Sequence, residues 1–392
     1  MKNIILKKGK EKSLFRYHPW LFSGAIANIE KGTKEGDVVR IENSEGEFMA
    51  IGHYQIGSIA IRILSFEECE IDYNFWKQKI QAAYNMRMKM GLMDKEDNNV
   101  FRLVHGEGDG LPGLIVDCYA NVAVIQFHDV AMYLERENIA KAIKEVMGDK
   151  LVAIYDKSEG TLPYKANIEP HNGYLYGEAD TFIAYENGLK FKVDWLEGQK
   201  TGFFIDQREN RALLEKYSKA KDVLNMFCYT GGFSFYAMRG GANSVHSVDV
   251  SERAIEIAKQ NVELNFPGDT RHEAFAEEAF KFLKTAEDKY DLIVLDPPAF
   301  AKHQNVLKNA IQGYKKLNRR GIEVIKPGGI IFTFSCSQVM TKEIFRQTIF
   351  TAAANTGRTV KILHQLTQPC DHPISIYHPE GEYLKGLVLY VE

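Results

Sequence analysis

The C-terminal half of the chain alternates apolar segments with helical patterns, and this alternation most restricts the fold. Helical spacing, for example at 253–264 and 309–325, separates apolar segments at 222–227, 244–250, 291–295 and 330–335. Near-continuous apolar strands separated by helices are typical of a parallel sheet covered on both faces. The sequence therefore predicts a doubly wound α/β domain over 188–392.

The N-terminal region has shorter elements. Apolar and polar residues alternate between glycine-containing turns at 37–42, 48–52 and 59–64. Period-two alternation bounded by turn residues indicates half-buried strands. We therefore predict a small β-barrel or sandwich over residues 1–71.

The middle region mixes both kinds of element. An amphipathic helix is predicted over 72–93, a hairpin from strands at 114–118 and 122–127, and a further helix over 132–147. These patterns predict a mixed α+β middle domain over 72–187. At roughly 150 residues per domain, a chain of 392 residues accommodates this three-domain division.

Composition and charge exclude two classes of protein. With 45% hydrophobic and 26% charged residues, the chain is not disordered, and a net charge of -3 excludes a uniformly basic body. Lys and Arg are nevertheless concentrated in the first twenty residues and in 299–326. Such stretches favour contact with a phosphate backbone, although a solvated arm or helix face has the same composition.

Export, membrane and metal signals are all lacking in the sequence. The first apolar run ends at Lys7, which is too short for a signal peptide, and no run approaches the ~20 residues of a membrane span. The cysteines are odd in number and contain no CxxC pair: Cys69, Cys118, Cys228, Cys336 and Cys370. We expect a cytoplasmic protein without a disulfide framework or a metal site, in which one cysteine is free for chemistry.

The ends of the first two predicted strands point to a nucleoside. The loop at 225–234 contains an adjacent Gly231-Gly232 pair in place of GxGxxG, which favours a nucleoside pocket over a pyrophosphate cradle, although such a pair also serves plain turns. Asp249 ends the next strand, where a carboxylate accepts from ribose hydroxyls, and Ser251 is the better helix cap. One of the adjacent acids Glu277 and Glu278 is a candidate for an adenine amino group, or both simply favour the helix dipole.

Two later strand ends carry reactive groups. Asp296 is followed by Pro297-Pro298, which forces the backbone out of the sheet and turns the carboxylate toward the ligand crevice. Cys336 follows the next strand between two serines, whose hydroxyls can stabilise a thiolate. Cys228 is the rival thiol, but it lies within the nucleoside loop and is better placed for packing.

Together these motifs resemble those of class I S-adenosylmethionine-dependent methyltransferases. More closely, the chain resembles the bacterial large-subunit (23S) ribosomal RNA cytosine-5 methyltransferases of the RlmI type. The likeness covers essentially the whole chain and includes the segments at 16–24 and 200–208. It implies an N-terminal PUA-like barrel, a middle α+β domain and a C-terminal, seven-stranded, Rossmann-like methyltransferase sheet.

The resemblance also implies residue roles. Cys336 is the nucleophile, and Asp296 orients the target base. The residues that it assigns to the cofactor S-adenosylmethionine are Asn225, Phe227, Tyr229, Thr230, Gly231, Gly232, Phe233, Ser234, Asp249, Glu278, Gln207 and Arg208. Those that it assigns to the RNA substrate are Pro297, Pro298, Phe300, Lys302, Lys315, Arg319 and Arg320. Glu278 stands where relatives commonly carry Asp. No second cysteine follows Pro298, so the group that assists release of the enzyme is unassigned, as is the base that removes the carbon-5 proton.

Chemistry explains why a thiol is needed. Cytosine carbon-5 is a weak nucleophile until a thiolate, here that of Cys336, adds to carbon-6. Asp296 would stabilise the charge that develops on the ring during this addition. The target base must be unpaired or flipped, and the partner is large-subunit ribosomal RNA, with a homodimer possible and no membrane involved.

Three alternatives remain open from the sequence. Transfer to an exocyclic amine uses a similar Asp-Pro-Pro loop and needs no thiol, but Ala299 occupies the position of the usual aromatic residue. An NAD-dependent oxidoreductase would use the same kind of sheet, but the third glycine is missing. A catalytically idle RNA-binding scaffold is the third.

Overall fold

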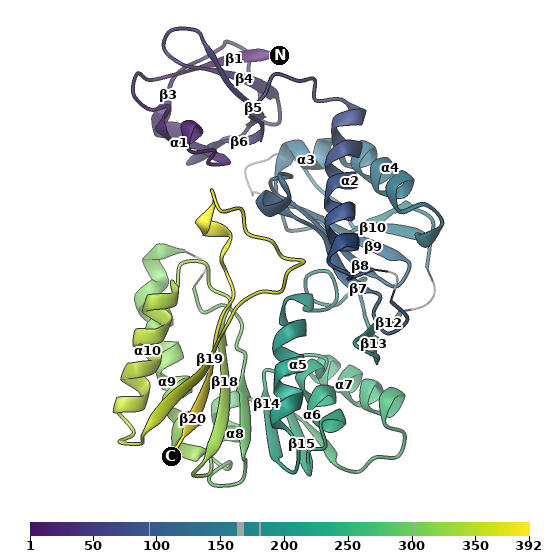
Figure 1. Cartoon of the computed structure of the whole chain (residues 1–392), viewed down its shortest axis with the longest axis vertical. Coiled ribbons are helices and arrows are strands. Elements are labelled where there is room, and N and C mark those ends of the chain that lie inside the picture. Colours follow the sequence, from purple (N-terminus) through teal and green to yellow (C-terminus); the bar gives the residue numbers. More distant parts are fainter. Residues whose placement is uncertain (94, 163–167, 180–181, 302) are drawn as a thin grey trace. The chain divides into compact units, whose positions relative to one another are not determined.

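The computed structural model describes residues 1–93, 95–162, 168–179, 182–301 and 303–392 (Figure 1). The described residues form two compact units. The first comprises Met1–Gly188, Val193–Ile205 and Cys370–Gly381, and the second comprises Leu189–Lys192, Asp206–Pro369 and Glu382–Glu392. The three-domain division at 1–71, 72–187 and 188–392 stays a prediction.

The N-terminal part of the first unit is a six-stranded sheet with the order β2-β6-β5-β4-β1-β3. Its elements are β1 (Lys2–Leu6), α1 (Lys12–Phe15), β2 (Trp20–Phe22), β3 (Ile26–Ile29), β4 (Val38–Glu42), β5 (Phe48–Tyr54) and β6 (Ile59–Ser65). The strands predicted at 37–42, 48–52 and 59–64 are therefore confirmed. Their inward residues, such as Leu21 and Ile41, are fully buried in one core.

A five-stranded sheet with the order β11-β10-β9-β8-β7 follows in the same unit. Its strands are β7 (Val100–His105), β8 (Leu114–Tyr119), β9 (Val122–Phe127), β10 (Ala153–Asp156) and β11 (Gly173–Tyr176). The predicted hairpin is confirmed, because β8 and β9 pair antiparallel. The helices α2 (Tyr73–Lys89) and α4 (Arg136–Met147) pack side by side (Figure 1). The short strand β12 (Ile183–Glu186) ends the region.

The single helix predicted over 132–147 is wrong. Two helices occupy this stretch, α3 (Val130–Leu134) and α4, with a non-helical residue, Glu135, between them. Asp129 starts α3 early, since its side chain accepts a hydrogen bond from the backbone N–H of Met132 at 3.1 Å. The 3.6-residue apolar period continues across the break, so periodicity alone does not reveal it.

The C-terminal segment Cys370–Gly381 packs within the first unit through buried polar contacts. The Asp371 carboxylate accepts a hydrogen bond from the backbone N–H of Arg102 in β7 at 3.0 Å. The guanidinium of Arg87 donates to the Asp371 carbonyl at 2.8 Å. At Gly108, an added Cβ would lie 1.9 Å from the Pro373 carbonyl oxygen, so only glycine allows this approach.

The second unit contains a seven-stranded sheet with the order β16-β15-β14-β17-β18-β20-β19. Its strands are β14 (Asp222–Met226), β15 (Ser244–Asp249), β16 (His272–Ala276), β17 (Leu292–Leu295), β18 (Gly329–Ser335), β19 (Val360–Leu366) and β20 (Lys385–Val391). The doubly wound, seven-stranded sheet is thus confirmed. The strands predicted at 222–227, 244–250, 291–295 and 330–335 pair in parallel, as expected. The strand β20, for which no pairing was predicted, runs antiparallel to both β18 and β19, because the chain turns back after β19 and inserts β20 between them.

Helices cover both faces of this sheet. They are α5 (Arg208–Tyr217), α6 (Gly232–Arg239), α7 (Glu252–Asn265), α8 (Ala279–Leu283), α9 (Leu307–Val324) and α10 (Lys342–Ala354), and β13 (Leu189–Lys192) packs on α7. Residues of α8, α9 and α10 share one core with Leu224, Ile293 and Ile331 of the sheet. On the other face, Tyr217 of α5 packs on Phe332, and Phe233 of α6 packs on Phe334.

We expect Asp371→Ala to destabilise β7 and the segment Cys370–Gly381. The substitution removes the carboxylate that accepts from the part-buried backbone N–H of Arg102, which costs about 1–3 kcal/mol. Hydrogen–deuterium exchange of peptides covering β7 should accelerate accordingly. Asp149→Ala, at an exposed position, is the control and should leave this exchange unchanged. Equal protection in the two variants would contradict the expectation.

Candidate active site at the carboxyl edge of the sheet

The predicted site residues gather at one edge of the seven-stranded sheet. The strands β14, β15, β17 and β18 run parallel, so their carboxyl ends share this edge (Figure 1). Ligands of open α/β sheets bind outside this edge. The loop after β14, Asp249, Asp296 and Cys336 all lie at these strand ends.

The loop after β14 has an unusual backbone. Phe227, Tyr229 and Gly231 all have positive φ angles, of 57°, 48° and 88°, while Cys228 and Thr230 between them do not. Left-handed non-glycine residues are rare, and they concentrate at functional sites. The N–H groups of Cys228 and Gly231 are already bonded to backbone carbonyls, and that of Tyr229 is bonded to the Asp249 carboxylate. At Gly231 an added Cβ would lie 2.6 Å from the ring of Phe235, so no larger residue is accommodated.

Asp249 fixes this loop. Its Oδ2 accepts from the backbone N–H of Tyr229 at 3.0 Å, and its Oδ1 accepts from the backbone N–H of Ser251 at 3.0 Å. The cap of α7 is Ser251, whose hydroxyl accepts from the N–H of Ala254, so the preference for Ser251 as the cap is confirmed. Each Asp249 oxygen retains a lone pair, and the neighbouring Val250 side chain is 74% exposed.

A chain of buried polar side chains supports the loop from below. The Asn225 amide donates to the Ser234 hydroxyl at 2.9 Å, Ser234 bonds Ser247 at 2.6 Å, and Ser247 bonds His272 at 2.7 Å. Burial lowers the pKa of His272 to about 4, so the ring is neutral. The chain links β14, α6, β15 and β16. Asn225 and Ser234 are therefore buried supports in this structure, beneath the surface to which the sequence assigned them.

Gln207 contacts the acid of the site. It ends the short 3-10 helix η5 (Ile205–Gln207), and its amide donates to Asp296 Oδ2 at 3.0 Å. Its own oxygen accepts from the Asn210 amide at 2.6 Å. Gln207, which the sequence assigned to the cofactor, thus orients Asp296. Arg208, assigned with it, is buried at the start of α5.

Asp296 has an elevated pKa. Burial is the main cause, the negative charge of Asp206 adds to it, and the Gln207 hydrogen bond and the Arg211 charge act in the opposite direction. The resulting pKa is about 7, so both the protonated and the ionised form of the carboxyl group are accessible near neutral pH. Asp296 can therefore act both as a hydrogen-bond donor and as an acceptor.

Cys336 follows Ser335, the last residue of β18, and its side chain is partly exposed. Burial raises the pKa of its thiol to about 12, with further contributions from the charges of Asp296 and Asp206, while Lys385 opposes them. The Lys385 ammonium is buried and donates to the carbonyls of Ser337 and Tyr383, at 2.6 Å each. It thereby holds the chain immediately after the thiol.

The rival Cys228 is buried. Its thiol donates to the carbonyl of Tyr229 at 3.5 Å, and burial raises its pKa well above the usual range. Of the two cysteines, Cys336 alone has exposed surface at the ligand edge. The predicted division of roles between these two thiols therefore agrees with their burial.

Two further predicted residues are engaged elsewhere. Glu278 caps α8, because its carboxylate accepts from the backbone N–H of Lys281 at 2.8 Å. The Phe300 ring packs on Tyr314 of α9, with the ring centroids 4.5 Å apart. Pro297 is buried and Pro298 is exposed at the start of this loop. The exposed proline is therefore the part of the loop that is open to a substrate.

The basic stretch at 299–326 does not form a single surface. The helix α9 leads from the carboxyl end of β17 to the amino end of β18, so its last turns approach the edge opposite the site. Arg319 and Arg320 pair there with Glu323, at 2.7 and 3.3 Å. Lys326 bonds Asp222 and Asp291, which lie at the starts of β14 and β17. Lys315 lies nearer the middle of α9, and Lys302 is outside the described residues.

Sequence reasoning missed three neighbours of Cys336 and Asp296. Asp206 accepts a hydrogen bond from the Tyr383 hydroxyl at 2.8 Å, and Lys385 holds the loop after Cys336. Asp206 lies within the motif at 200–208, which was the one available signal. Tyr383 and Lys385 reach the site only because β20 inserts beside β18, and nothing local in the sequence indicates this pairing.

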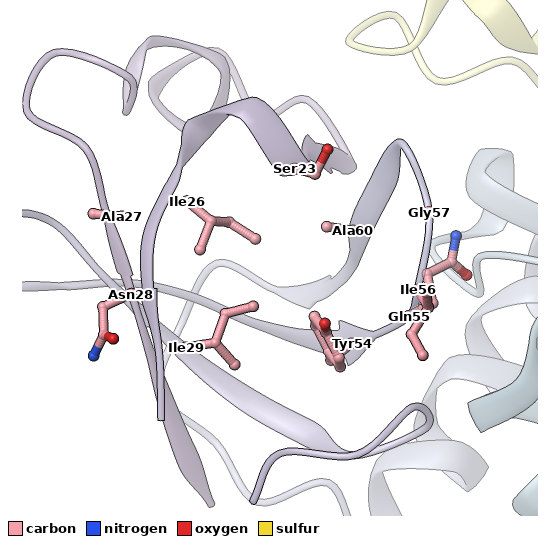
Figure 2. A pocket seen from close by; sticks show the side chains of 10 residues that line it. All are labelled: Ser23, Ile26, Ala27, Asn28, Ile29, Tyr54, Gln55, Ile56, Gly57 and Ala60. Carbon is pink, nitrogen blue, oxygen red and sulfur yellow. The ribbon is translucent and has the colours of Figure 1, made fainter. Parts of the chain in front are cut away.

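A pocket of about 500 Å³ lies elsewhere, on the N-terminal sheet (Figure 2). In Figure 2 the side chains of Ile26 and Ile29 point into it, and Tyr54 and Ala60 line it opposite them. None of its lining residues is acidic, basic, His or Cys. Across the described ranges, no cluster of acidic, His and Cys residues could hold a metal ion, and no helix has the length and apolarity needed to cross a membrane.

The chain matches two family models and many curated proteins. Residues 102–379 match the family described as S-adenosylmethionine-dependent methyltransferase, and residues 4–66 match a PUA-like domain. Ribosomal RNA large subunit methyltransferase I of Alteromonas mediterranea is 40% identical over 394 residues, which are 99% of this chain and 98% of that protein. The protein of the same name from Escherichia coli is 39% identical over 395 residues, with 99% of both chains covered.

A solved structure shares the fold over its whole length. It is described as a putative methyltransferase complexed with SAH, the demethylated cofactor product. The two chains superpose with a TM-score of 0.87 at 24% sequence identity, and 100% of each chain is covered. At this identity the likeness shows that the architecture is shared.

We expect Asp296→Asn to make the Cys336 thiol more reactive. Removing a negative charge lowers the pKa of a neighbouring thiol, so at a fixed pH near 8 more thiolate is present. The thiolate fraction should rise about tenfold for each pKa unit of the decrease, and the alkylation rate with iodoacetamide should rise by roughly three- to fourfold, because a thiolate of lower pKa is a weaker nucleophile. Peptide mass spectrometry measures this rate, with the exposed Cys370 as an internal reference. An unchanged or slower rate at Cys336 would refute the coupling.

Proposed function

Because the chain belongs to the S-adenosylmethionine-dependent methyltransferase family, we propose that it methylates carbon-5 of a cytosine in large-subunit ribosomal RNA. The matches confirm the resemblance that was drawn from the motifs, and with it S-adenosylmethionine as the cofactor. Relatives at 38–40% identity carry the name Ribosomal RNA large subunit methyltransferase I, which supports ribosomal RNA as the substrate.

The observation that carries the proposal is a partly exposed thiol beside a carboxyl group with an elevated pKa. Cys336 and Asp296 follow the neighbouring parallel strands β18 and β17. Transfer to an exocyclic amine needs no thiol at this point. In addition, the amine route uses an aromatic residue after Asp-Pro-Pro. The nearest one here is Phe300, whose ring packs against Tyr314. Carbon-5 methylation therefore explains the site better.

The residues present can hold the cofactor. The tight turn around Gly231 lets a ligand approach the backbone closely, and the free lone pairs of Asp249 suit the ribose hydroxyls of the cofactor. Val250, exposed beside Asp249, offers an apolar contact for the flat adenine ring. When bound, S-adenosylmethionine supplies a methyl group activated on a sulfonium. Gly231 and Thr230 shape the loop, while Asn225 and Ser234 keep it in place.

Asp296 and Cys336 act as a coupled pair. While Asp296 is ionised, its charge opposes formation of the Cys336 thiolate. When Asp296 is protonated and donates to the cytosine ring nitrogen, that charge is lost and the thiol ionises more easily. The same hydrogen bond withdraws electrons from the ring, and this favours addition of the thiolate to carbon-6. Binding of the base thus activates the nucleophile.

RNA contacts are expected at the open part of the site and on the PUA-like region. Pro298 and Lys315 lie on the loop and helix that follow β17, and Lys308 is exposed in the first turn of α9. The base must leave its helix to reach Cys336, at a cost of a few kcal/mol that backbone contacts offset. Arg319 and Arg320, paired with Glu323, contribute less to this surface than the sequence suggested.

We expect Cys336→Ala to abolish methylation while leaving cofactor binding intact. The variant lacks the nucleophile but keeps the loop at 227–231 and Asp249. Incorporation of labelled methyl groups into ribosomal RNA should fall to background, and calorimetry should give an unchanged affinity for S-adenosylhomocysteine. Mass mapping of ribosomal RNA from cells that lack the protein should show the loss of one 5-methylcytosine. Retained methylation by the variant would favour the amine route.

We expect Asp249→Ala to weaken S-adenosylhomocysteine binding by about 10- to 100-fold. The variant loses acceptors for the ribose hydroxyls and the anchor of the Tyr229 N–H, and hydrogen bonds to a charged group contribute about 1.5–3 kcal/mol. Titration calorimetry measures the affinity. Glu252→Ala, an exposed acid two residues beyond Val250, should bind normally. Equal affinity in the two variants would remove Asp249 from the cofactor site.

A further inference from the structure

We propose that Asp206 is the base that removes the carbon-5 proton, a role that rests on the proposed cytosine-5 methylation. After methyl transfer, carbon-5 carries both the new methyl group and its original hydrogen. The proton must pass to a base, while the C–H electron pair forms the carbon-5 to carbon-6 double bond and expels the sulfur of Cys336 as thiolate. The loop after β17, Pro297-Pro298-Ala299, contains no cysteine that could assist this release.

Asp206 has one carboxylate oxygen available for a proton. Its Oδ2 accepts from the Tyr383 hydroxyl at 2.8 Å, which fixes the orientation of the group. Its Oδ1 is shielded from solvent and has no hydrogen-bond partner within the described residues. A buried carboxylate oxygen without a partner is unfavourable in the free protein. A site that retains one therefore has an acceptor ready for use.

The other charged groups near Cys336 are already engaged. The charges that act most strongly on its thiol are those of Asp296, Asp206 and Lys385. Asp296 is held by Gln207 and serves the ring nitrogen in the proposed reaction. Lys385, with a pKa of about 8, is mainly an ammonium near neutral pH, so it donates to two backbone carbonyls and has no lone pair to accept a proton. Asp206 is the remaining group with a free acceptor.

The base must lie on the same face of the cytosine ring as the sulfur of Cys336. The cofactor and Cys336 cannot occupy the same face of the ring, so the methyl group arrives opposite the sulfur. The hydrogen on carbon-5 is then displaced to the sulfur's face. Asp206 is adjacent in sequence to Gln207, which bonds Asp296, and its charge acts on both Cys336 and Asp296, so its carboxylate lies close to both reacting groups.

The test compares Asp206→Asn with wild-type protein on transcribed large-subunit ribosomal RNA and S-adenosylmethionine. The amide keeps the size of the side chain but cannot take a proton. The variant should accumulate a protein–RNA adduct that survives denaturing electrophoresis, and its release of methylated RNA should fall at least 100-fold. Wild-type protein should show this adduct only on RNA containing 5-fluorocytidine, in which no carbon-5 proton can be removed.

Two controls accompany the test. The double variant Asp206→Asn, Cys336→Ala should form no adduct on either RNA. Asp288→Asn, an exposed acid with φ of 48° at which asparagine is well tolerated, should behave as wild type. On the fluorinated RNA, Asp206→Asn should form as much adduct as wild type, since attack by Cys336 precedes proton removal.

The experiment distinguishes failure of the role of Asp206 from failure of the proposed function. Release of 5-methylcytosine by Asp206→Asn at the wild-type rate overturns the role of Asp206 and leaves the proposed function intact. A variant that forms no adduct on the fluorinated RNA overturns it as well, because Asp206 is then needed before the proton is removed. If wild-type protein forms no adduct on fluorinated RNA and makes no 5-methylcytosine, the proposed function itself fails.

Discussion

The position of β18 between β17 and β20 is the constraint on which the site depends. Parallel pairing with β17 brings Asp296 beside Cys336, and antiparallel pairing with β20 opposes Ser335 to Lys385 in register. Backbone hydrogen bonds of the ladders fix these neighbours, so the side chains need little freedom to meet. The end of β18 thereby brings together three groups from distant parts of the chain: the nucleophile Cys336, the acid Asp296 and the buried cation Lys385.

The charges of Asp296 and Lys385 influence the ionisation of the Cys336 thiol, and this sets the reactivity of the site. Burial raises the pKa of both Asp296 and Cys336, and the negative charge of Asp296 further opposes ionisation of the Cys336 thiol. Lys385 lies close enough to oppose that effect, although burial lowers its own pKa to about 8. In the free protein Cys336 therefore stays a protonated thiol. Because the thiolate is the form that oxidants attack, this protects Cys336 from oxidation in the absence of RNA.

Much of the fold followed from periodicity, because apolar strands and amphipathic helices carry strong local signals. The strand ends at Asp249, Asp296 and Cys336 followed from the same pattern, since parallel strands share one carboxyl edge. The insertion of β20 was not predictable, because strand order depends on pairings remote in sequence. The roles of Gln207 and Asp206, and the separation of Arg319 from the site, likewise needed side-chain positions that a motif does not specify.

The left-handed backbone at Phe227 and Tyr229 has an evolutionary consequence. At these positions a side chain must be compatible with strain as well as with a ligand, and β-branched residues such as valine meet that condition poorly. The substitutions accepted at these two positions should therefore be mainly to asparagine, histidine or glycine. Sequence variation at two residues would then report on the shape of the main chain as much as on any contact that their side chains make.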